Sequence, residues 1–208
     1  GRTELMEGIV GLRPAKGDVR HKGKPVHFRD AHDSLTAGIA YLSEDRKGKG
    51  LLLQKDLRVN LTLASLKKFI RGFQIDRRRE GAALDEAIRE FDIRTGRKDI
   101  LAGQLSGGNQ QKLLLAKMMM LDPTIVIIDE PTRGIDVGTK EQIYRFIAGL
   151  ADEGRSIIVV SSEMPELIGI CDRIVVMREG RIAGEVSGER MTEHEIVALA
   201  TGVEGQAA

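Results

Sequence analysis

The sequence predicts an α/β fold, in which a mostly parallel sheet is flanked by helices. Short apolar runs rich in Ile and Val, at residues 125–128 and 156–160, alternate with segments whose apolar residues recur at helical spacing. Strands separated by helices of this length pair in parallel through right-handed crossovers. Alternating residues around a glycine turn at 17–26 add a small antiparallel β element.

The first half of the chain holds several helical patterns around one apolar strand. A short helix is expected over 2–11, a strand over 38–42 and a charged, glycine-bearing loop over 43–50. Helices are expected over 60–70 and 79–91. The run Arg77-Arg78-Arg79 is either a phosphate patch or a solvated helix start, and the acids that follow it favour the second reading.

The second half has clearer boundaries. We expect helices over 113–121 and 140–150, the latter capped by Gly154, and strands buried on both faces over 125–128, 156–160 and 173–177. A turn at Glu179-Gly180 makes 173–186 a hairpin. Thr192 and Glu195 form a capping box for a last helix that ends near Gly202. The tail 204–208 is predicted to be disordered.

Composition excludes several classes of protein. The 208 residues carry 32 basic and 31 acidic side chains, and this balance argues against a nucleic-acid partner. A single cysteine, Cys171, excludes an internal disulfide and indicates a small buried apolar residue. No apolar run reaches the ~18 residues that a membrane-spanning helix needs. The chain has no signal peptide and begins Gly1-Arg2-Thr3, so we interpret it as a piece of a longer protein.

Two adjacent carboxylates, Asp129 and Glu130, end the apolar strand at 125–128. Open α/β sheets bind their ligands at the carboxyl ends of their strands. In phosphoryl transfer, a first carboxylate there holds Mg²⁺ and the next orients the attacking water. The alternative is a strand that ends in two surface acids.

A second candidate site begins at Ser106-Gly107-Gly108, ahead of a helix. Helix N-termini offer free N–H groups and a positive dipole end, and glycines let the backbone approach a phosphate closely. An ordinary N-cap explains Ser106 equally well. It does not explain the two glycines, which weaken a helix start.

Together these segments resemble the signature motif and the Walker B strand of ATP-binding cassette (ABC) proteins. Asn109-Gln110-Gln111-Lys112 after the glycines is similar to the second cassette of bacterial monosaccharide importers. The resemblance implies a P-loop NTPase-like fold as one domain over 1–208, lacking its N-terminal strands. It also implies an inserted helical signature subdomain at approximately 55–120, with ATP and Mg²⁺ as cofactors.

The resemblance assigns roles to residues of this second half. Asp129 would bind the metal and Glu130 would be catalytic, while Ser106, Gly107, Gly108 and Gln110 would bind nucleotide. Asp136, in the loop after the acid pair, would lie against a partner cassette. A helix start at Asp136 is the alternative.

Three positions depart from the pattern of active cassettes. Gly1-Arg2-Thr3 resembles the end of a phosphate-binding loop, with Arg2 where the family has Lys and Thr3 where a hydroxyl binds Mg²⁺. Ser162 stands where the family has a His beside the γ-phosphate, and it cannot carry that positive charge. Glu44 replaces a Gln that couples to the permease, and its loop is either such a contact or a solvated turn.

These departures imply a cassette that supplies its signature motif in trans while its own site is degenerate. The expected function is sugar uptake driven by ATP binding and hydrolysis, with this chain alone inactive. Its partners would be a second cassette, the transmembrane permease and, indirectly, a periplasmic sugar-binding protein. It would be cytoplasmic, peripheral on the inner face of the membrane. The alternatives are a non-transport ABC ATPase and a non-hydrolysing regulatory cassette.

The lack of a strand before the phosphate loop predicts a stability problem. That strand runs mid-sheet in the family, so its loss would leave backbone groups unpaired. We expect the isolated chain to be marginally stable, oligomeric or prone to add a foreign strand.

Overall fold

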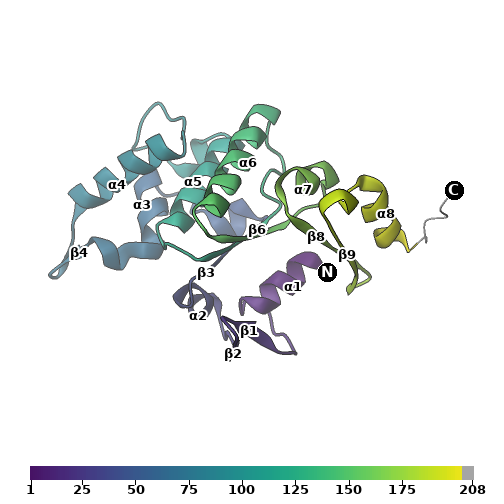
Figure 1. The fold of residues 1–208 in the computed structure, drawn as a ribbon. Helices are drawn as coiled ribbons and strands as arrows, with labels where there is room; N and C mark the ends of the chain where they lie inside the picture. Colours follow the sequence, from purple (N-terminus) through teal and green to yellow (C-terminus); the bar gives the residue numbers. More distant parts are fainter. Residues whose placement is uncertain (203–208) are drawn as a thin grey trace. The chain divides into compact units, whose positions relative to one another are not determined.

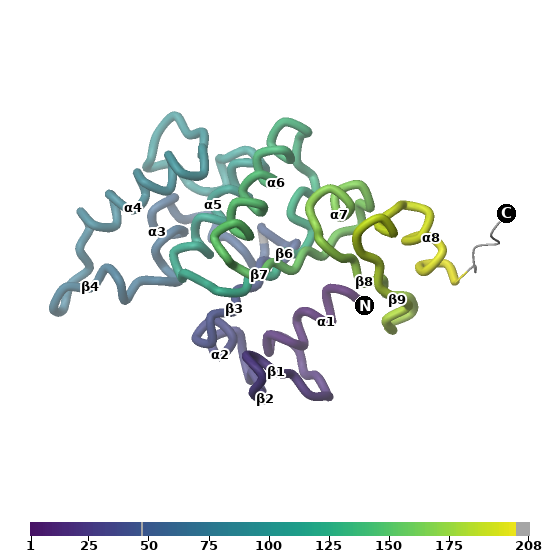
Figure 2. Tube along the Cα trace, in the orientation of Figure 1, coloured from purple at the N-terminus to yellow at the C-terminus, as the bar shows by residue number. Residues whose placement is uncertain are grey.

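The computed structural model describes residues 1–202, apart from the Lys47 side chain, as two compact units (Figures 1 and 2). The first unit combines residues 1–37 with the chain from Ile158 onward, and the second covers Gly38–Ile157. The predicted disorder of the tail 204–208 concerns residues outside this range.

A parallel sheet positions the acid pair of the second unit. Strand β3 (Ile39–Leu42) pairs in parallel with β6 (Ile125–Asp129), and the sheet has the order β3-β6-β7. Strand β7 (Ser156–Val160) carries the chain from the second unit into the first. Residues 126–129 of β6 are all buried, as expected for a strand covered on both faces. The α/β prediction and its parallel pairing are confirmed.

The other elements of the second unit are mostly helical. They are a π-helical turn η1 (Arg46–Gly50), α3 (Leu57–Thr62), the 3₁₀ helix η2 (Leu63–Phe69), hairpin β4 (Ile70–Arg71) and β5 (Gln74–Ile75), α4 (Arg77–Glu90), η3 (Ala102–Gln104), α5 (Gly107–Met119) and α6 (Val137–Asp152). Leu57 and Leu61 of α3, Leu113 of α5 and Ile143 of α6 form its almost fully buried core. Among residues 1–202, no helix is long and apolar enough to cross a membrane.

The first unit combines both ends of the described chain. It contains α1 (Arg2–Ile9), β1 (Val19–His21), β2 (Lys24–Val26), α2 (Ala31–Thr36), α7 (Met164–Ile170), β8 (Arg173–Arg178), β9 (Arg181–Ser187), η4 (Gly188–Arg190) and α8 (Glu193–Thr201). Both predicted hairpins, β1-β2 and β8-β9, are present and antiparallel. Thr192 caps α8 and Gly202 ends it in a left-handed conformation, as predicted. Cys171 packs half-buried beside the core of Ile174, Val176, Val186 and Ile196.

The helix predicted over 60–70 differs from the structure at both ends. It begins earlier, at Leu57, because the Asp56 side chain accepts a hydrogen bond from the Val59 amide and caps it. It tightens to a 3₁₀ helix from Leu63, with a non-helical Ser65 inside. The predicted loop over 43–50 likewise contains the turn η1, which the Asp45 side chain caps at the Gly48 amide.

Two strands predicted to be buried on both faces are not. In β7 only Val160 is buried, and Ile158 is 40% exposed. In β8 only Ile174 and Val176 are buried. The apolar runs do not distinguish a strand covered on both faces from one covered on a single face. In both strands alternate residues are exposed, because successive side chains point to opposite faces and only one face is covered.

The arginine run at the start of α4 belongs to a capped helix start. The Asp76 side chain accepts hydrogen bonds from the Arg78 and Arg79 amides. Arg77 pairs at 3.2 Å with Glu80, a buried carboxylate that also accepts a hydrogen bond from Thr62. These contacts agree with the reading of the run as a helix start.

Candidate nucleotide site

The acid pair lies at the carboxyl end of β6, where the sequence places it. Asp129 is 1% exposed, and its Oδ2 accepts a hydrogen bond of 2.9 Å from the Tyr41 hydroxyl. Tyr41 lies opposite Ile127 in the parallel register, and residues two apart on a strand share a face. Sequence reasoning missed Tyr41, although a tyrosine inside an otherwise apolar strand is a signal for a buried polar contact.

Glu130 turns the chain sharply after the strand. Its φ of 50° lies in the left-handed region, which costs a non-glycine residue about 1–2 kcal/mol. The Glu130 carbonyl accepts a bond from the Arg133 amide, which closes the turn. Four other non-glycine residues, Asp92 and Asp122 among them, have a similar φ, so the backbone shows a tight turn and the catalytic role of Glu130 stays a prediction.

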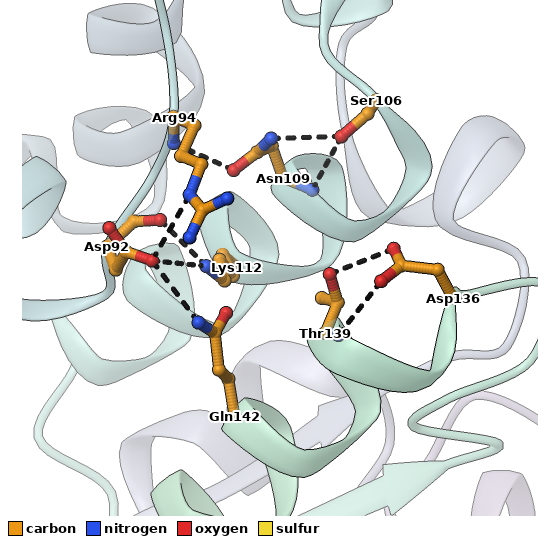
Figure 3. A network of polar contacts seen from close by, with 8 residues as sticks. All are labelled: Asp92, Arg94, Ser106, Asn109, Lys112, Asp136, Thr139 and Gln142. Carbon is orange, nitrogen blue, oxygen red and sulfur yellow. Dashed lines mark hydrogen bonds and ion pairs between the residues drawn. The ribbon is translucent and has the colours of Figure 1, made fainter.

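Ser106 is the N-cap of α5, and its hydroxyl belongs to a polar network (Figure 3). The hydroxyl accepts bonds from the Asn109 amide at 3.4 Å and from Asn109 Nδ2 at 2.9 Å. Asn109 Oδ1 in turn accepts from the Arg94 amide at 2.8 Å. The simple N-cap interpretation therefore holds, and the network fixes the orientation of the serine.

The two glycines after Ser106 have different surroundings. A Cβ added to Gly108 would lie 2.7 Å from Cγ2 of Thr139 on α6, which is closer than atoms can approach. A Cβ added to Gly107 would reach Gly134 O at 3.5 Å, an ordinary contact. Helix packing therefore requires glycine at 108, a reason that the sequence alone does not reveal.

Gln110, predicted to bind nucleotide, has its side chain inside the second unit. It is buried, and its Nε2 donates to the Leu105 carbonyl at 3.1 Å. Its Oε1 is buried without a hydrogen-bond partner among the described residues. In this conformation the Gln110 side chain binds the backbone just before the start of α5.

Asp136, predicted to face a partner cassette, is the N-cap of α6 (Figure 3). Its carboxylate accepts bonds from the Thr139 amide at 3.0 Å and the Thr139 hydroxyl at 2.9 Å. These bonds, the amide first, lower the pKa of Asp136. The structure thus shows the helix-start alternative, and the partner contact stays a prediction.

The charged loop after β3 contacts the loop that follows the acid pair. Glu44 Oε2 pairs with Arg133 Nη1 at 2.5 Å. Arg46 donates from Nη1 to the Gly107 carbonyl at 2.9 Å and from Nη2 to the Arg133 carbonyl at 3.0 Å. Arg46 therefore joins the start of α5 to the loop beyond Glu130. Sequence reasoning did not single it out, because a charged loop residue carries no pattern that points to a partner.

The remaining predicted residues, Arg2, Thr3 and Ser162, lie in the first unit. Arg2 is the first residue of α1, and its Nη1 donates to the Ser161 carbonyl at 2.5 Å. Ser161 directly precedes the exposed Ser162, and its hydroxyl bonds the buried Glu166 carboxylate. The structure thus brings Arg2 next to the segment that carries Ser162, while Thr3 is half-buried beside it in α1.

Among the described residues, no cluster of three His, Cys, Asp or Glu side chains can hold a metal ion. The candidate donor is the single carboxylate of Asp129. Mg²⁺ is commonly bound by one or two carboxylates, with water and substrate phosphates completing its shell, so this oxygen donor fits that ion.

The chain is similar to curated import proteins along nearly its whole length. It is 48% identical over 98% of its length to the ribose import ATP-binding protein RbsA 2 of Rhizobium meliloti. It is 43% identical over 98% to RbsA of Clostridium perfringens, and 46% identical over 97% to a putative ribose/galactose/methyl galactoside import ATP-binding protein of Rhizobium etli. The chain spans only 40%, 41% and 39% of these relatives.

Solved structures share the fold. A dimeric ATP-binding cassette bound to ADP and Pi superposes with a TM-score of 0.75 at 20% identity, covering 90% of this chain and 80% of that one. A component of the cbiONQ ABC transporter complex from Clostridium perfringens gives 0.74 at 21%, covering 95% and 77%. The family model described as ABC transporter matches residues 1–133. The ordered motifs, the fold and this match show that the chain belongs to the ABC transporter family of ATP-binding cassettes.

Proposed function

We propose that this chain is the second ATP-binding cassette of a bacterial monosaccharide importer. It lends its signature helix to a nucleotide that the first cassette holds, and its own site hydrolyses ATP poorly. The names of the similar proteins, which are ribose and galactoside import proteins, support the cargo class. The partners are a first cassette, the permease subunits and a sugar-binding protein.

The observation that carries the proposal is the contrast between two predicted nucleotide contacts. The start of α5 is held in one orientation by the Ser106–Asn109–Arg94 contacts. Arg2, where an active cassette has its phosphate-binding lysine, is instead bonded to the carbonyl of Ser161. An arginine whose guanidinium already donates to a main-chain carbonyl is a weaker phosphate ligand. This contact supports a degenerate site.

The residues of the chain divide the chemistry between them. When bound, Mg²⁺ supplies charge neutralisation on the phosphates, and Asp129 is the residue that would hold it. Tyr41 orients the Asp129 carboxylate through its hydroxyl. Glu130 can accept a proton from an attacking water. Ser162 supplies a hydroxyl in place of an imidazole, so it offers less stabilisation to developing charge.

The test replaces Ser106 in the whole natural polypeptide assembled with its permease. Ser106→Arg places a cation and extra bulk at the start of α5, and we expect ATP hydrolysis to fall about 100-fold, in the range seen when one transition-state contact is lost. Ser187→Arg is the matched control, because Ser187 is an exposed N-cap without a side-chain hydrogen bond. Normal hydrolysis by the Ser106→Arg assembly would contradict the proposal.

A further inference from the structure

We propose that Arg46 is a positioning residue, which fixes the start of the signature helix α5 against the loop that follows the acid pair. This inference rests on the proposed function, because it assigns a role to the signature helix and that loop together. The guanidinium of Arg46 hydrogen-bonds the Gly107 and Arg133 carbonyls, and not the side chains of the acid pair or of Ser106. It acts through the backbone of their neighbours.

The geometry matches one planar guanidinium to two backbone acceptors. The carbonyl of Gly107 belongs to the first residue of α5, and the carbonyl of Arg133 belongs to the turn closed by the Glu130 carbonyl. The two bonds measure 2.9 Å and 3.0 Å, both normal lengths. Because both acceptors are main-chain atoms, the contact fixes the course of the backbone at each end. A lysine, as a single point charge, cannot reproduce this fork.

The turn that carries Arg46 is itself anchored. Asp45 caps the Gly48 amide at 2.8 Å. Lys117, on the third turn of α5, donates from Nζ to the Gly50 carbonyl at 2.8 Å. The turn η1 is thus fastened to α5 at both of its ends, by Arg46 at the first helical residue and by Lys117 further along. Arg46 therefore starts from a fixed base.

Burial strengthens the contact. Arg46 is half-buried, and desolvation lowers the pKa of its guanidinium from the usual value. If the guanidinium moved away, the two carbonyls would lose their hydrogen-bond donor. The partly desolvated charge would in turn lose its acceptors. A Cβ added to Gly107 would make only ordinary contacts with Gly134 O at 3.5 Å and Arg46 Nη1 at 3.8 Å, so the hydrogen bonds of Arg46 are what join the two segments. The start of α5 and the loop over 131–136 touch at Arg46.

The consequence is a fixed spacing between two segments that the proposed function uses together. The signature helix reaches a nucleotide on the first cassette, and Asp136 follows the same loop. Since Arg46 bonds the backbone of both segments, its loss would disturb both at once. Nucleotide affinity would change little, whereas the rate of the assembled site would fall.

Two variants and one control test this inference. Arg46→Met keeps the apolar stem and removes both bonds, and Arg46→Lys restores a charge without the fork. Arg145→Met is the control, because Arg145 lies exposed on α6 in the same unit and, among the described residues, pairs with Glu141 alone, at 2.6 Å. The first measurement is hydrogen–deuterium exchange of the wild-type and variant chains. The second is ATP hydrolysis by the whole polypeptide with its permease.

With Arg46→Met, hydrogen–deuterium exchange should become faster in two peptides that are distant in sequence, 105–112 and 130–136. The kcat for ATP hydrolysis should fall about tenfold, as expected when a charged group loses its acceptors. KM for ATP should change less than about twofold, because the Arg46 guanidinium is engaged by two main-chain carbonyls and the proposed role is positioning. Arg46→Lys should lie between Arg46→Met and wild type, and Arg145→Met should match wild type.

A purely structural role would lower the unfolding temperature and leave kcat per folded molecule unchanged, which would overturn the inference. So would faster exchange in only one of the two peptides. If Ser106→Arg also left hydrolysis intact, the proposed function would fail with it. If Ser106→Arg abolished hydrolysis while Arg46→Met did not, only the role of Arg46 would fail.

Discussion

At the scale of single residues, two positions are constrained by geometry more than by chemistry. Glu130 occupies a left-handed conformation that favours glycine, and Gly108 lies where a side chain would strike Thr139. Resemblance to ABC proteins assigns both to nucleotide chemistry, whereas their surroundings show what the fold demands of them. At Gly108 the two demands are separable by mutation.

Gly108→Ala should lower the free energy of unfolding by about 1–3 kcal/mol, the usual cost of overpacking, despite the better helix propensity of alanine. The reason is the distance of 2.7 Å between the new Cβ and Thr139 Cγ2. Thr139→Ser removes that methyl group while keeping the hydroxyl bond to Asp136. Urea unfolding of the two single variants and the double variant measures the coupling.

Gly107→Ala serves as the control, because its nearest neighbour lies 3.5 Å away. If the clash is the cause, the double variant should have a higher free energy of unfolding than the two single changes predict when added. A purely additive result would show that the clash does not make position 108 sensitive.

At the scale of elements, α5 is held by polar contacts along its first half. Beyond Ser106 and Asn109, the buried Lys112 donates from Nζ to the Asp92 carbonyl at 2.7 Å and to the Asp92 carboxylate at 3.2 Å (Figure 3). Gln142 of α6 reaches the same carboxylate at 3.4 Å. Asp92 thus connects the end of α4 to α5 and to α6.

The Asp92 contact should make stability depend on pH. The hydrogen bond from Lys112, and then its charge, lower the pKa of Asp92 from 3.8. The ionised Asp92 carboxylate therefore adds to the free energy of unfolding above pH 3.8. This stabilisation is lost as the pH falls through the lower pKa that Asp92 has in the folded state. Asp92→Asn should therefore destabilise at neutral pH, by less than about 1 kcal/mol because the carboxylate is largely exposed.

Urea unfolding of Asp92→Asn and wild type, across the acid range, checks this. Asparagine tolerates the left-handed backbone at position 92, so the substitution tests the charge. Asp18→Asn, at an exposed position, should show no such dependence. The free energy of unfolding of Asp92→Asn and of wild type should converge at the lowest pH. If the difference between them persisted there, the ionised carboxylate would not be its cause.

At the scale of the whole molecule, the sheet of the second unit has a buried outer strand. Ile39, Ala40 and Leu42 of β3 are buried, yet β3 pairs only with β6 among the described residues. A strand edge without a partner in its own sheet can pair with a strand of another chain once the segments that cover it open.

We therefore predict that the unfolding temperature of the isolated chain rises with protein concentration, because association stabilises the folded state by mass action. Calorimetry over a hundredfold range of concentration, with sedimentation velocity at the same points, measures both effects. A sharp two-state transition of a monomer, independent of concentration, would count against the prediction.

The sequence was sufficient to predict most of the elements but not their environments. Alternating apolar and helical patterns predicted β3, β6 and two hairpins, β1-β2 and β8-β9, since periodicity depends on local residues. They did not predict the short hairpin β4-β5. The same runs did not distinguish the exposed face of β7 from a covered one, because burial depends on neighbouring strands. Motif order assigned roles to Asp129, Glu130 and Ser106, and these roles stay predictions. Tyr41 and Arg46 depend on contacts across 88 and 61 residues, for which one sequence has no signal.

The two carbonyl acceptors of Arg46 make that contact insensitive to ionic strength. Dissolved salt weakens attraction between exposed charges over a screening length of about 8 Å at physiological concentration. The exposed pair of Glu44 and Arg133 falls in this class. Salt screens a hydrogen bond from a half-buried guanidinium to a neutral carbonyl much less. Added salt should therefore weaken the pair of Glu44 and Arg133, while the two hydrogen bonds of Arg46 stay in place.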